Sequence, residues 1–411
     1  MTHADPDAPP LDGAYAWTRL GLSLAVALIG NAGMWAVILL LPDLQAEFGG
    51  DRAAASLPYT TTMLGFALGN FVIGRWIDRY GAGPALCISG LALGAAYLAA
   101  AAAPSILWLS AVQAVIGFAT AASFAPLVAD VSHWFRARRG LAVAAAASGN
   151  YLAGAVWPLI LAPIAAQADW RAAYWALAAA SALVMAPLAL TLRRKAPEAH
   201  LAAADAAAAS AARDAGFGPR ALIALLGVAG IGCCVAMSMP QVHIVAMCVD
   251  LGYGAAAGAQ MLSLMLAAGV VSRLISGWLA DRLGGVVTLL IGSSLQGLAL
   301  ALYLPFDGLT SLYLVSFVFG LSQGGIVPSY AVIVREYLPA RQAGALTGFV
   351  IMTTILGMAF GGWISGWLYD LTGSYAAALI NGIAFNALNV AVMLLILLRA
   401  SSRPPAGAAP A

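Results

Sequence analysis

The feature that most constrains this chain is a series of twelve apolar stretches, each long enough to cross a membrane as a helix. A bilayer core about 30 Å thick is spanned by roughly 20 residues at about 1.5 Å rise per residue. In lipid, backbone polar groups have no water to bond, so a spanning segment must satisfy them internally as an α-helix. The sequence therefore predicts an all-α membrane protein with twelve transmembrane helices, at about 17–41, 53–76, 84–103, 106–131, 140–166, 172–192, 220–249, 256–280, 286–304, 309–334, 342–367 and 374–398.

Composition supports this class and argues against others. Of the 411 residues, 62% are apolar and 9% are charged, which is far more apolar than a soluble domain requires. The net charge of +2 gives no indication of a nucleic-acid partner. The four cysteines lie within or at the ends of apolar runs, so we interpret them as small buried side chains. No nucleophile elbow, metal cluster or phosphate-binding loop is present, and we expect neither an enzyme nor a cofactor or metal site.

The connections between the apolar stretches divide the chain into two sets of six. Most are short, but residues 193–219 form a long, alanine-rich and charged segment. We interpret it as a cytoplasmic linker, or a helix on the membrane surface. The predicted organisation is an N-terminal tail, a first six-helix bundle, this linker, a second bundle and a C-terminal tail, at residues 1–16, 17–192, 193–219, 220–398 and 399–411.

The distribution of basic residues predicts the orientation. If both termini are cytoplasmic, Arg52 and Arg171 are the only basic residues in outer loops, among 19 lysines and arginines in the chain. Cytoplasmic loops of membrane proteins carry an excess of Lys and Arg. We therefore expect a multi-pass plasma membrane protein, in a bacterial inner membrane, with both termini cytoplasmic. We also expect it to act as a monomer.

The two sets of six helices are copies of each other. Gly74 to Gly81 matches Gly277 to Gly284 at an offset of 203, with Asp78-Arg79 falling on Asp281-Arg282. The same offset carries Trp134-Phe-Arg-Ala-Arg138 onto Tyr337-Leu-Pro-Ala-Arg341. A single offset that recovers two loop motifs indicates tandem duplication. Both copies begin on the same side of the membrane, so the repeats are parallel.

The Gly-x-x-x-Asp-Arg-x-Gly loop after the second helix of each set resembles the signature of the major facilitator superfamily. This resemblance implies two bundles that rock against each other. An aspartate near a helix end can pair with arginines of a neighbouring loop and hold the cytoplasmic face closed. Alternatively, these residues fix only topology and loop shape. The candidate gate residues are Asp78 and Arg79 with Arg136, Arg138 or Arg139, and Asp281 and Arg282 with Arg341.

Arg273 is the residue that narrows the cargo. It lies eight residues before Asp281, hence roughly 12 Å inside a core of about 30 Å. An arginine at this depth costs several kcal/mol unless it faces a polar cavity and a partner, yet its own helix offers no acidic residue. The offset places the neutral Asn70 at the equivalent position. We predict that Arg273 binds an anion, and guanidinium geometry suits a carboxylate. The alternative is a structural arginine that caps buried carbonyls.

Several stretches resemble the monocarboxylate transporter family within this superfamily. Asp12 to Trp17 is similar to that family's entry to the first helix. Trp134 to Ala142, continuing to Ser148-Gly149-Asn150, resembles its loop and fifth-helix motif. Asp169-Trp170-Arg171 is similar to its Gly-Trp-Arg, with the glycine replaced. The resemblance implies that Arg273 is the eighth-helix arginine that holds the substrate carboxylate.

The chain also departs from that family. Animal members carry an aspartate one turn before the arginine and a lysine deep in the first helix, where this chain has Gly269 and Trp35. Those residues are linked to proton coupling, so the departures put coupling in question. The related oxalate/formate exchanger pairs its arginine with an eleventh-helix lysine, but residues 344–366 hold no basic side chain here. One cation favours a monoanion over a dianion.

Further polar and aromatic residues fall inside the apolar runs. Each is either a cavity residue or, as is common in membranes, a helix-packing residue. His243, near Pro240, is the candidate proton carrier, with a satisfied core histidine as the alternative. Asp130 is a weaker candidate that we expect to meet Arg136 or Arg138. The candidate substrate-binding residues besides Arg273 are Asn31, Trp35, Asn150, Tyr151, Gln323 and Thr353.

These observations lead to three hypotheses. The first is a gradient-driven or facilitative transporter of a small monocarboxylate of the 2-hydroxy or 2-oxo acid type, with protons as a candidate coupled ion. The second is an exporter of amphiphilic or drug-like compounds, which predicts an acidic residue in the central cavity. The third is a non-transporting sensor or scaffold, which usually carries an appended soluble domain.

Overall fold

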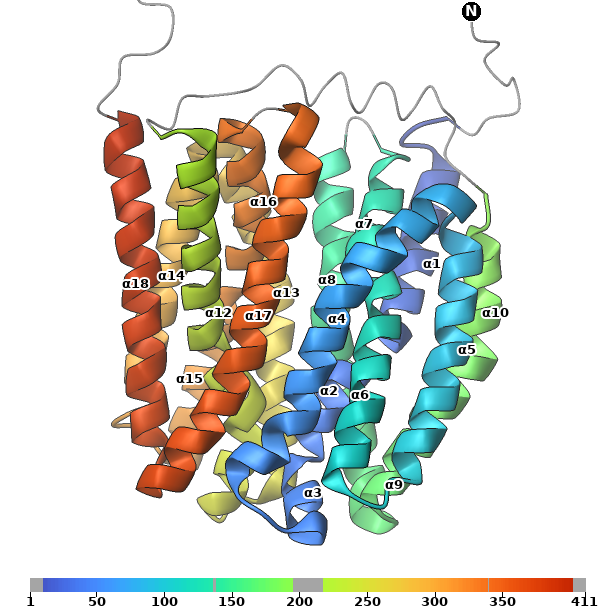
Figure 1. Cartoon of the computed structure of the whole chain (residues 1–411), viewed down its shortest axis with the longest axis vertical. Coiled ribbons are helices and arrows are strands. Elements are labelled where there is room, and N and C mark those ends of the chain that lie inside the picture. The colour runs from blue at the N-terminus through green and yellow to red at the C-terminus, as the bar shows by residue number, and fades with distance from the viewer. Residues whose placement is uncertain (1–9, 136–137, 195–216, 339, 402–411) are drawn as a thin grey trace, which may run out of the picture.

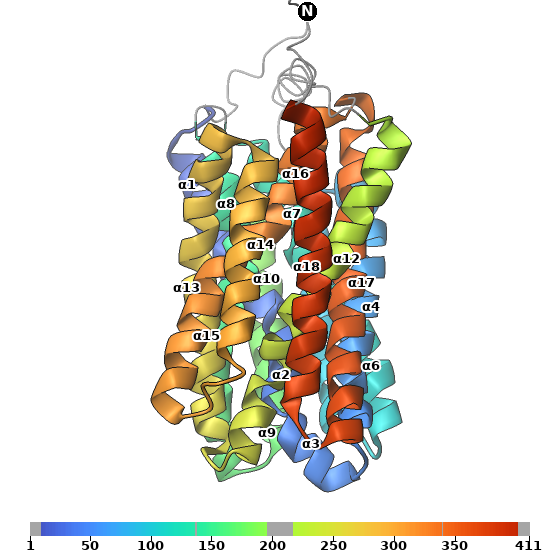
Figure 2. The same cartoon turned by 90° about the vertical axis from the view of Figure 1, so that its left-hand side faces the viewer.

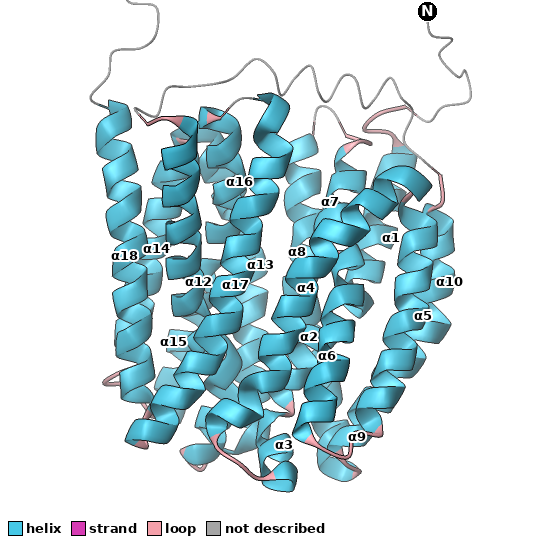
Figure 3. Cartoon of the chain, viewed as in Figure 1, coloured by secondary structure: helices cyan, strands magenta, loops and turns pink. Residues whose placement is uncertain are grey.

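The computed structural model describes residues 10–135, 138–194, 217–338 and 340–401, and this part of the chain is helical without strands (Figures 1 and 3). We call the end of the bundle where α1 begins and α18 ends the linker face, and the end that holds α3 the far face. The helices of the first half are α1 (Ala14–Gly30), α2 (Ala32–Leu39), α3 (Leu41–Phe48), α4 (Arg52–Tyr80), α5 (Ala82–Ala101), α6 (Ile106–Thr120), α7 (Ala125–Ser132), α8 (Arg139–Gln167), α9 (Trp170–Ala179) and α10 (Ala186–Ala189). Those of the second half are α12 (Pro219–Asp250), α13 (Gly254–Leu283), α14 (Gly285–Leu302), α15 (Leu309–Gln323), α16 (Ile326–Tyr337), α17 (Ala340–Thr372) and α18 (Tyr375–Ser401).

Eleven of the described helical segments are long and apolar enough to cross a membrane. The twelfth expected span is α4, which has 29 residues and runs beside α6 and α17 (Figure 1). It is more polar than the others, and its polar residues include threonines that bond to the neighbouring helix α6. The hydroxyl of Thr61 donates to the Ser110 carbonyl, and that of Thr62 donates to Gln113. The predicted twelve-helix arrangement is therefore present, with one polar member at the centre of the molecule.

The two halves pack their helices in the same way. In the first, an added Cβ at Gly117 of α6 would lie 1.9 Å from the Thr62 carbonyl oxygen of α4. In the second, an added Cβ at Gly320 of α15 would lie 2.1 Å from the Met265 carbonyl oxygen of α13. Both members of the first pair map onto the second at the offset of 203 found in the sequence. At each crossing the backbones approach closely because the residue is glycine.

Several predicted spans contain a break in the helix, although each is one continuous apolar run in the sequence. The first breaks at Asn31, between α1 and α2, and the fourth breaks between α6 and α7. The tenth breaks at Gly324-Gly325, where α13 leaves no room for a side chain. The sixth contains a wider π turn over Ala180–Met185. The fourth and tenth breaks occupy equivalent places in the two repeats, so they belong to the repeated architecture.

Some predicted boundaries shift. Pro219, assigned to the linker, is the first residue of α12, a position where its missing N–H leaves no bond unmade. Helix α18 continues to Ser401 and α1 begins at Ala14, so both enter segments that we had assigned to tails. The expected surface helix in the linker falls on residues 195–216, which lie outside the described residues.

Candidate substrate site

A cavity of about 50 Å³ lies between the two halves of the molecule. Its lining comes from α2, α4, α8 and the start of α7 in the first half, and from α12, α13, α16 and α17 in the second. Figure 2 shows these helices from the side of the second half. Arg273 is the one charged residue among the described lining residues. The structure thus places the predicted cation at the junction of the halves.

Arg273 is 4% exposed and reaches across from α13 to the first half. Its Nε donates to the Gly324 carbonyl at 3.1 Å, within its own half. Its Nη1 donates to the carbonyl of Ala147 on α8, in the other half. Its Cζ lies 4.1 Å from the centre of the Tyr151 ring, a cation–π contact. No described ion pair includes Arg273. It therefore caps buried carbonyls, as the structural alternative predicted, while it keeps its charge without an acidic partner.

Gly269 explains why no aspartate stands one turn before Arg273. An added Cβ at Gly269 would lie 2.8 Å from Cδ2 of the Tyr151 ring. The aromatic ring occupies the space that an acidic side chain would need, and the same ring carries the Arg273 guanidinium on its face. Tyr151 is thus the aromatic partner of the arginine at a place where the sequence showed only that its helix offers no acidic residue.

Trp35 and Asn150 complete the first-half wall of the cavity. The Trp35 Nε1 donates to the Asn150 carbonyl at 2.9 Å and to its Oδ1 at 3.0 Å. The Trp35 ring meets Tyr151 edge to face, with centroids 6.4 Å apart. The structure therefore brings four of the predicted residues together around the cavity, including Arg273.

Three other predicted residues do not line this cavity. The Asn31 amide donates to the Ala27 and Ser123 carbonyls, so it ties the break after α1 to the end of α6. Gln323 accepts from the Gln241 amide at 2.7 Å, which joins α15 to α12. Thr353 turns back to the Val350 carbonyl, whereas its neighbour Thr354 lines the cavity. In this structure Asn31 and Gln323 join neighbouring segments, whereas the Thr353 hydroxyl bonds within its own helix.

His243 is fully buried on α12, towards the far face. One ring nitrogen, Nε2, is 2.8 Å from the Gly362 carbonyl of α17, and the ring packs beside Tyr375. Its Nδ1 has no hydrogen-bond partner among the described residues. The histidine is therefore satisfied on one nitrogen and separate from the cavity lining.

The linker-face gate residues are described only in part. The Asp78, Arg139 and Arg341 side chains and residue Arg136 lie outside the described parts, so the predicted pairs of Asp78 and Asp281 remain predictions. Asp281 is exposed. The Arg79 guanidinium lies over Tyr80, and that of Arg282 lies 4.0 Å from the centre of the Trp278 ring. The backbone amide of Arg138 donates to the Asp12 carboxylate, and the Arg138 side chain is exposed.

Asp130 corrects our expectation. Its partner is Arg19 on α1, with Arg19 Nη2 2.8 Å from Asp130 Oδ2, rather than an arginine of the following loop. Arg19 is 2% exposed and also donates to the Leu192 carbonyl and the Tyr15 hydroxyl. The signal for this pair in the sequence is Arg19 itself, a charged residue inside the first apolar run. The pair joins α1 to α7 within the first half.

The two family motifs at the start of the chain and before α8 contact each other. Tyr15 packs edge to face on Trp134 at 5.0 Å, and Trp17 packs on Phe135 at the same separation. The Asp12 amide donates to the Trp134 carbonyl, and the Asp12 carboxylate accepts from the Arg138 amide. The motifs therefore build one small aromatic cluster at the linker face of the first half.

The described ion pair that joins the halves lies at the far face. Arg52, at the start of α4, donates to the Asp250 carboxylate at the end of α12, at 2.7 and 2.9 Å. The carboxylate of Asp370, at the end of α17, accepts from the backbone amides of Arg52 and Ala53 at 2.7 and 2.8 Å. Asp51 caps the next amide, that of Ala54. Most of the first turn of α4 is thus capped by the other half of the molecule.

A second far-face cluster ties α3 to α9 within the first half. Both terminal nitrogens of Arg171 donate to the Glu47 carboxylate, which also accepts from the Trp170 indole. Hydrogen bonds from Arg171 lower the pKa of the Glu47 carboxyl. This arrangement gives Asp169-Trp170-Arg171 a structural role away from the cavity.

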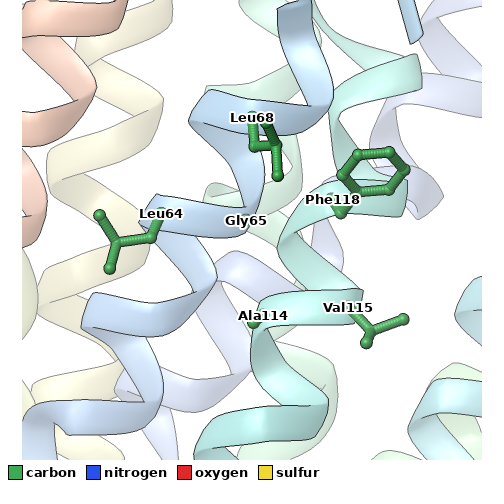
Figure 4. Close-up of a pocket in the computed structure, with 6 residues that line it drawn as sticks. All are labelled: Leu64, Gly65, Leu68, Ala114, Val115 and Phe118. Carbon is green, nitrogen blue, oxygen red and sulfur yellow. The ribbon is translucent and has the colours of Figure 1, made fainter. Parts of the chain in front are cut away.

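A larger hollow of about 410 Å³ lies on the surface between α4 and α6 (Figure 4). It is apolar, with Leu64, Leu68, Val115 and Phe118 around the small residues that let the two helices approach. With no charged or hydrogen-bonding side chain among its lining, it is a lipid-facing groove and offers no site for an anion.

The comparisons with known proteins agree with this geometry. A sequence profile of the Major Facilitator Superfamily matches residues 22–311 and 287–411. Monocarboxylate transporter 11 of Mus musculus is 30% identical over 91% of this chain and 85% of its own length. The agnestins efflux protein AgnL12 of Paecilomyces divaricatus is 22% identical over 85% of this chain and 80% of its own length. The chain belongs to the Major Facilitator Superfamily of transporters.

A solved structure confirms the fold. A bacterial homologue of the human lysosomal transporter Spinster, crystallised in an inward-facing and occupied conformation, aligns with a TM-score of 0.67. The alignment covers 94% of this chain and 95% of that one at 12% identity. The sequence profile confirms the predicted superfamily, and the similarity to monocarboxylate transporter 11 confirms the predicted resemblance.

Proposed function

We propose that this transporter moves a small monocarboxylate anion by alternating access, with Arg273 as the carboxylate-binding residue. The observation that carries the proposal is a buried guanidinium in a cavity between the halves, without an acidic partner among the described residues. A buried cation is costly unless it is paired, so the site favours an anionic ligand. The 2-hydroxy and 2-oxo acids predicted from the sequence are the smallest of the candidate substrates.

The contacts of Arg273 suggest how binding couples to movement. Its Nη1 bond to Ala147 crosses from one half to the other, whereas its Nε bond to Gly324 stays within its own half. An incoming carboxylate accepts a charge-assisted bond from the guanidinium and takes the place of the Ala147 carbonyl. Breaking the bond to Ala147 removes one link between the halves, while the Tyr151 ring, also in the first half, keeps its contact with the guanidinium. The loss of that hydrogen bond favours rocking of the halves around the loaded site.

The far face is closed in this state, and the linker face is the side from which we propose the cavity is reached. Asp370 caps the first turn of α4 across the interface, and Arg52 pairs with Asp250 beside it. We propose that this group opens when the halves rock, while the predicted residues at the linker face form the opposing gate. We propose the orientation that the basic residues predict, with the linker face cytoplasmic in a bacterial inner membrane and a monomer as the working unit.

His243 is the candidate residue for coupling to protons. Its free Nδ1 is available to a proton, but it lies outside the cavity lining. At Arg273 the partner is Tyr151, which offers no carboxylate for protonation. We therefore propose a uniport or exchange mode at the substrate site itself.

Ligand binding to the purified protein tests the proposal. A carboxylate present at about 100 times its dissociation constant should stabilise the protein by roughly 2.7 kcal/mol, visible as a raised melting temperature. Arg273→Gln should abolish that shift and saturable uptake into proteoliposomes. Arg220→Gln, which removes an exposed arginine at the start of α12, is the control and should respond like the parent. Equal shifts in parent and Arg273→Gln would refute Arg273 as the carboxylate site.

The second candidate function is export of amphiphilic compounds, favoured by the mainly apolar lining and by the efflux protein among the relatives. For cationic compounds it requires an acidic residue, and the described lining has none. Lipophilic cations that raise the melting temperature when carboxylates do not would favour this alternative.

A further inference from the structure

Away from Arg273 the cavity wall is mainly apolar, and methionine is its most frequent residue type. Met34 and Met63 come from the first half, on α2 and α4, and Met237 and Met358 come from the second, on α12 and α17. The sulfur of Met237 lies 3.9 Å from the hydroxyl of Tyr151, the residue that supports Arg273. The charged end of the cavity therefore leads directly into a wall of thioethers contributed by both halves.

The lining holds few polar groups, and several of their atoms already have partners. The Oδ1 of Asn150 accepts from the Trp35 indole, and the Thr354 hydroxyl donates to the Ile351 carbonyl. The Tyr151 hydroxyl points at the Met237 sulfur, a weak acceptor. A second polar group on a ligand would leave water and find few partners, which is unfavourable.

We infer that the transported acid has an apolar body, an unbranched alkyl or aryl chain carrying one carboxylate, in preference to a small 2-hydroxy acid. This inference rests on the proposed function, since it takes Arg273 as the carboxylate site. The carboxylate meets the Arg273 guanidinium, and the chain lies among the four methionines. Methionine side chains are unbranched and flexible, so they repack around ligands of different length and make favourable contacts with aromatic rings. The cavity measures about 50 Å³ in this structure, and we expect it to enlarge as these flexible side chains repack around a ligand.

The test is a set of matched acids bound to the whole purified protein. Affinities of acetate, butyrate, hexanoate and phenylacetate, measured by thermal shift and calorimetry, should rise with chain length by up to roughly fourfold per methylene. The decisive pair is butyrate against 2-hydroxybutyrate, which differ by one hydroxyl. We expect the hydroxy acid to bind about tenfold more weakly, because its hydroxyl leaves water for a mainly apolar wall with few polar partners. Equal or tighter binding of 2-hydroxybutyrate, or affinities independent of chain length, would overturn the inference.

A variant locates the chain of the acid. Met358→Gln keeps the length of the side chain but makes the wall polar, so it should flatten the chain-length dependence by weakening hexanoate binding more than acetate binding. Met352→Gln, six residues earlier on α17 and outside the lining, should keep the parental dependence. The acid series on the parent protein decides the inference even if a variant does not fold.

The two proposals fail in different ways. If no acid binds in an Arg273-dependent manner, the proposed function itself is wrong. If acids require Arg273 but short hydroxy acids bind best, the carboxylate site stands and only the apolar body is refuted.

Discussion

Replacing Asp370 by alanine should loosen the far face of the transporter without unfolding either half. The carboxylate accepts from the amides of Arg52 and Ala53 at 2.7 and 2.8 Å, and these amides belong to the opposite half. Loss of an N-terminal helix cap costs about 0.5–2 kcal/mol, and loss of the negative charge beside the helix dipole adds about 0.3–1 kcal/mol. Since these bonds exist only while the far face is closed, the loss acts on the closed-to-open equilibrium.

The expected shift follows from these magnitudes. A loss of about 1–2 kcal/mol lowers the closed-to-open ratio roughly 5- to 30-fold. A population that is about 99% closed in the parent then falls to between about 77% and 95%. Spin labels on Ala46→Cys of α3 and Leu371→Cys of α17, both exposed at the far face, report this change as a longer-distance component in pulsed electron resonance.

Asp51 provides the matched control. It caps the Ala54 amide of the same helix turn at 2.7 Å, but it belongs to the same half as that amide. Asp51→Ala should lower stability by about 1 kcal/mol without changing the distance distribution, because its bond does not depend on closure. An unchanged distribution in folded Asp370→Ala, or an equal change in Asp51→Ala, would refute the cross-half cap as a closing device.

Three further predictions concern the interior and the far face. Gly269→Asp should lower the melting temperature because the new side chain crowds Tyr151, an overpacking cost of about 1–3 kcal/mol. A second change, Tyr151→Ala, should restore the melting temperature. An undiminished melting temperature in the single variant would contradict the packing argument. Asp130→Ala should destabilise by about 3 kcal/mol in denaturant unfolding, since it leaves the buried Arg19 charge without its carboxylate, whereas a loss below about 0.5 kcal/mol would show that the pair is dispensable. The pKa of the Glu47 carboxyl is lowered in the folded protein, so its contribution to stability is present above its unfolded pKa and is lost as the pH falls through the folded pKa. Glu47→Gln should therefore reduce the loss of unfolding free energy between pH 6 and pH 3.5. The reduction should be less than about 1 kcal/mol, because this ion pair is partly exposed.

Helix positions could be predicted because each span needs a long apolar run, and the repeat was visible because its loop motifs have small residues that the turns require. The rotation of each helix was not predictable, since neighbouring residues differ by about 100° around the axis. Thr353 and Thr354 show this limit, because the second lines the cavity and the first faces the Val350 carbonyl. The far-face cap was also hidden, because Asp370 and Arg52 are separated by 318 positions. Arg273 was found because charge within an apolar run is costly wherever the helix points.

The Tyr151 ring under Arg273 has an electrical consequence. An aromatic partner cannot neutralise the guanidinium, so the substrate site of the empty carrier bears a positive charge, and the same site is neutral once a monoanion occupies it. In the proposed uniport mode, each monoanion that crosses without a proton transfers one elementary charge. A membrane potential of 100 mV then changes the driving force by roughly 2.3 kcal/mol, equivalent to about 50-fold in concentration. With the interior negative, the voltage by itself would drive the proposed anion out of the cell.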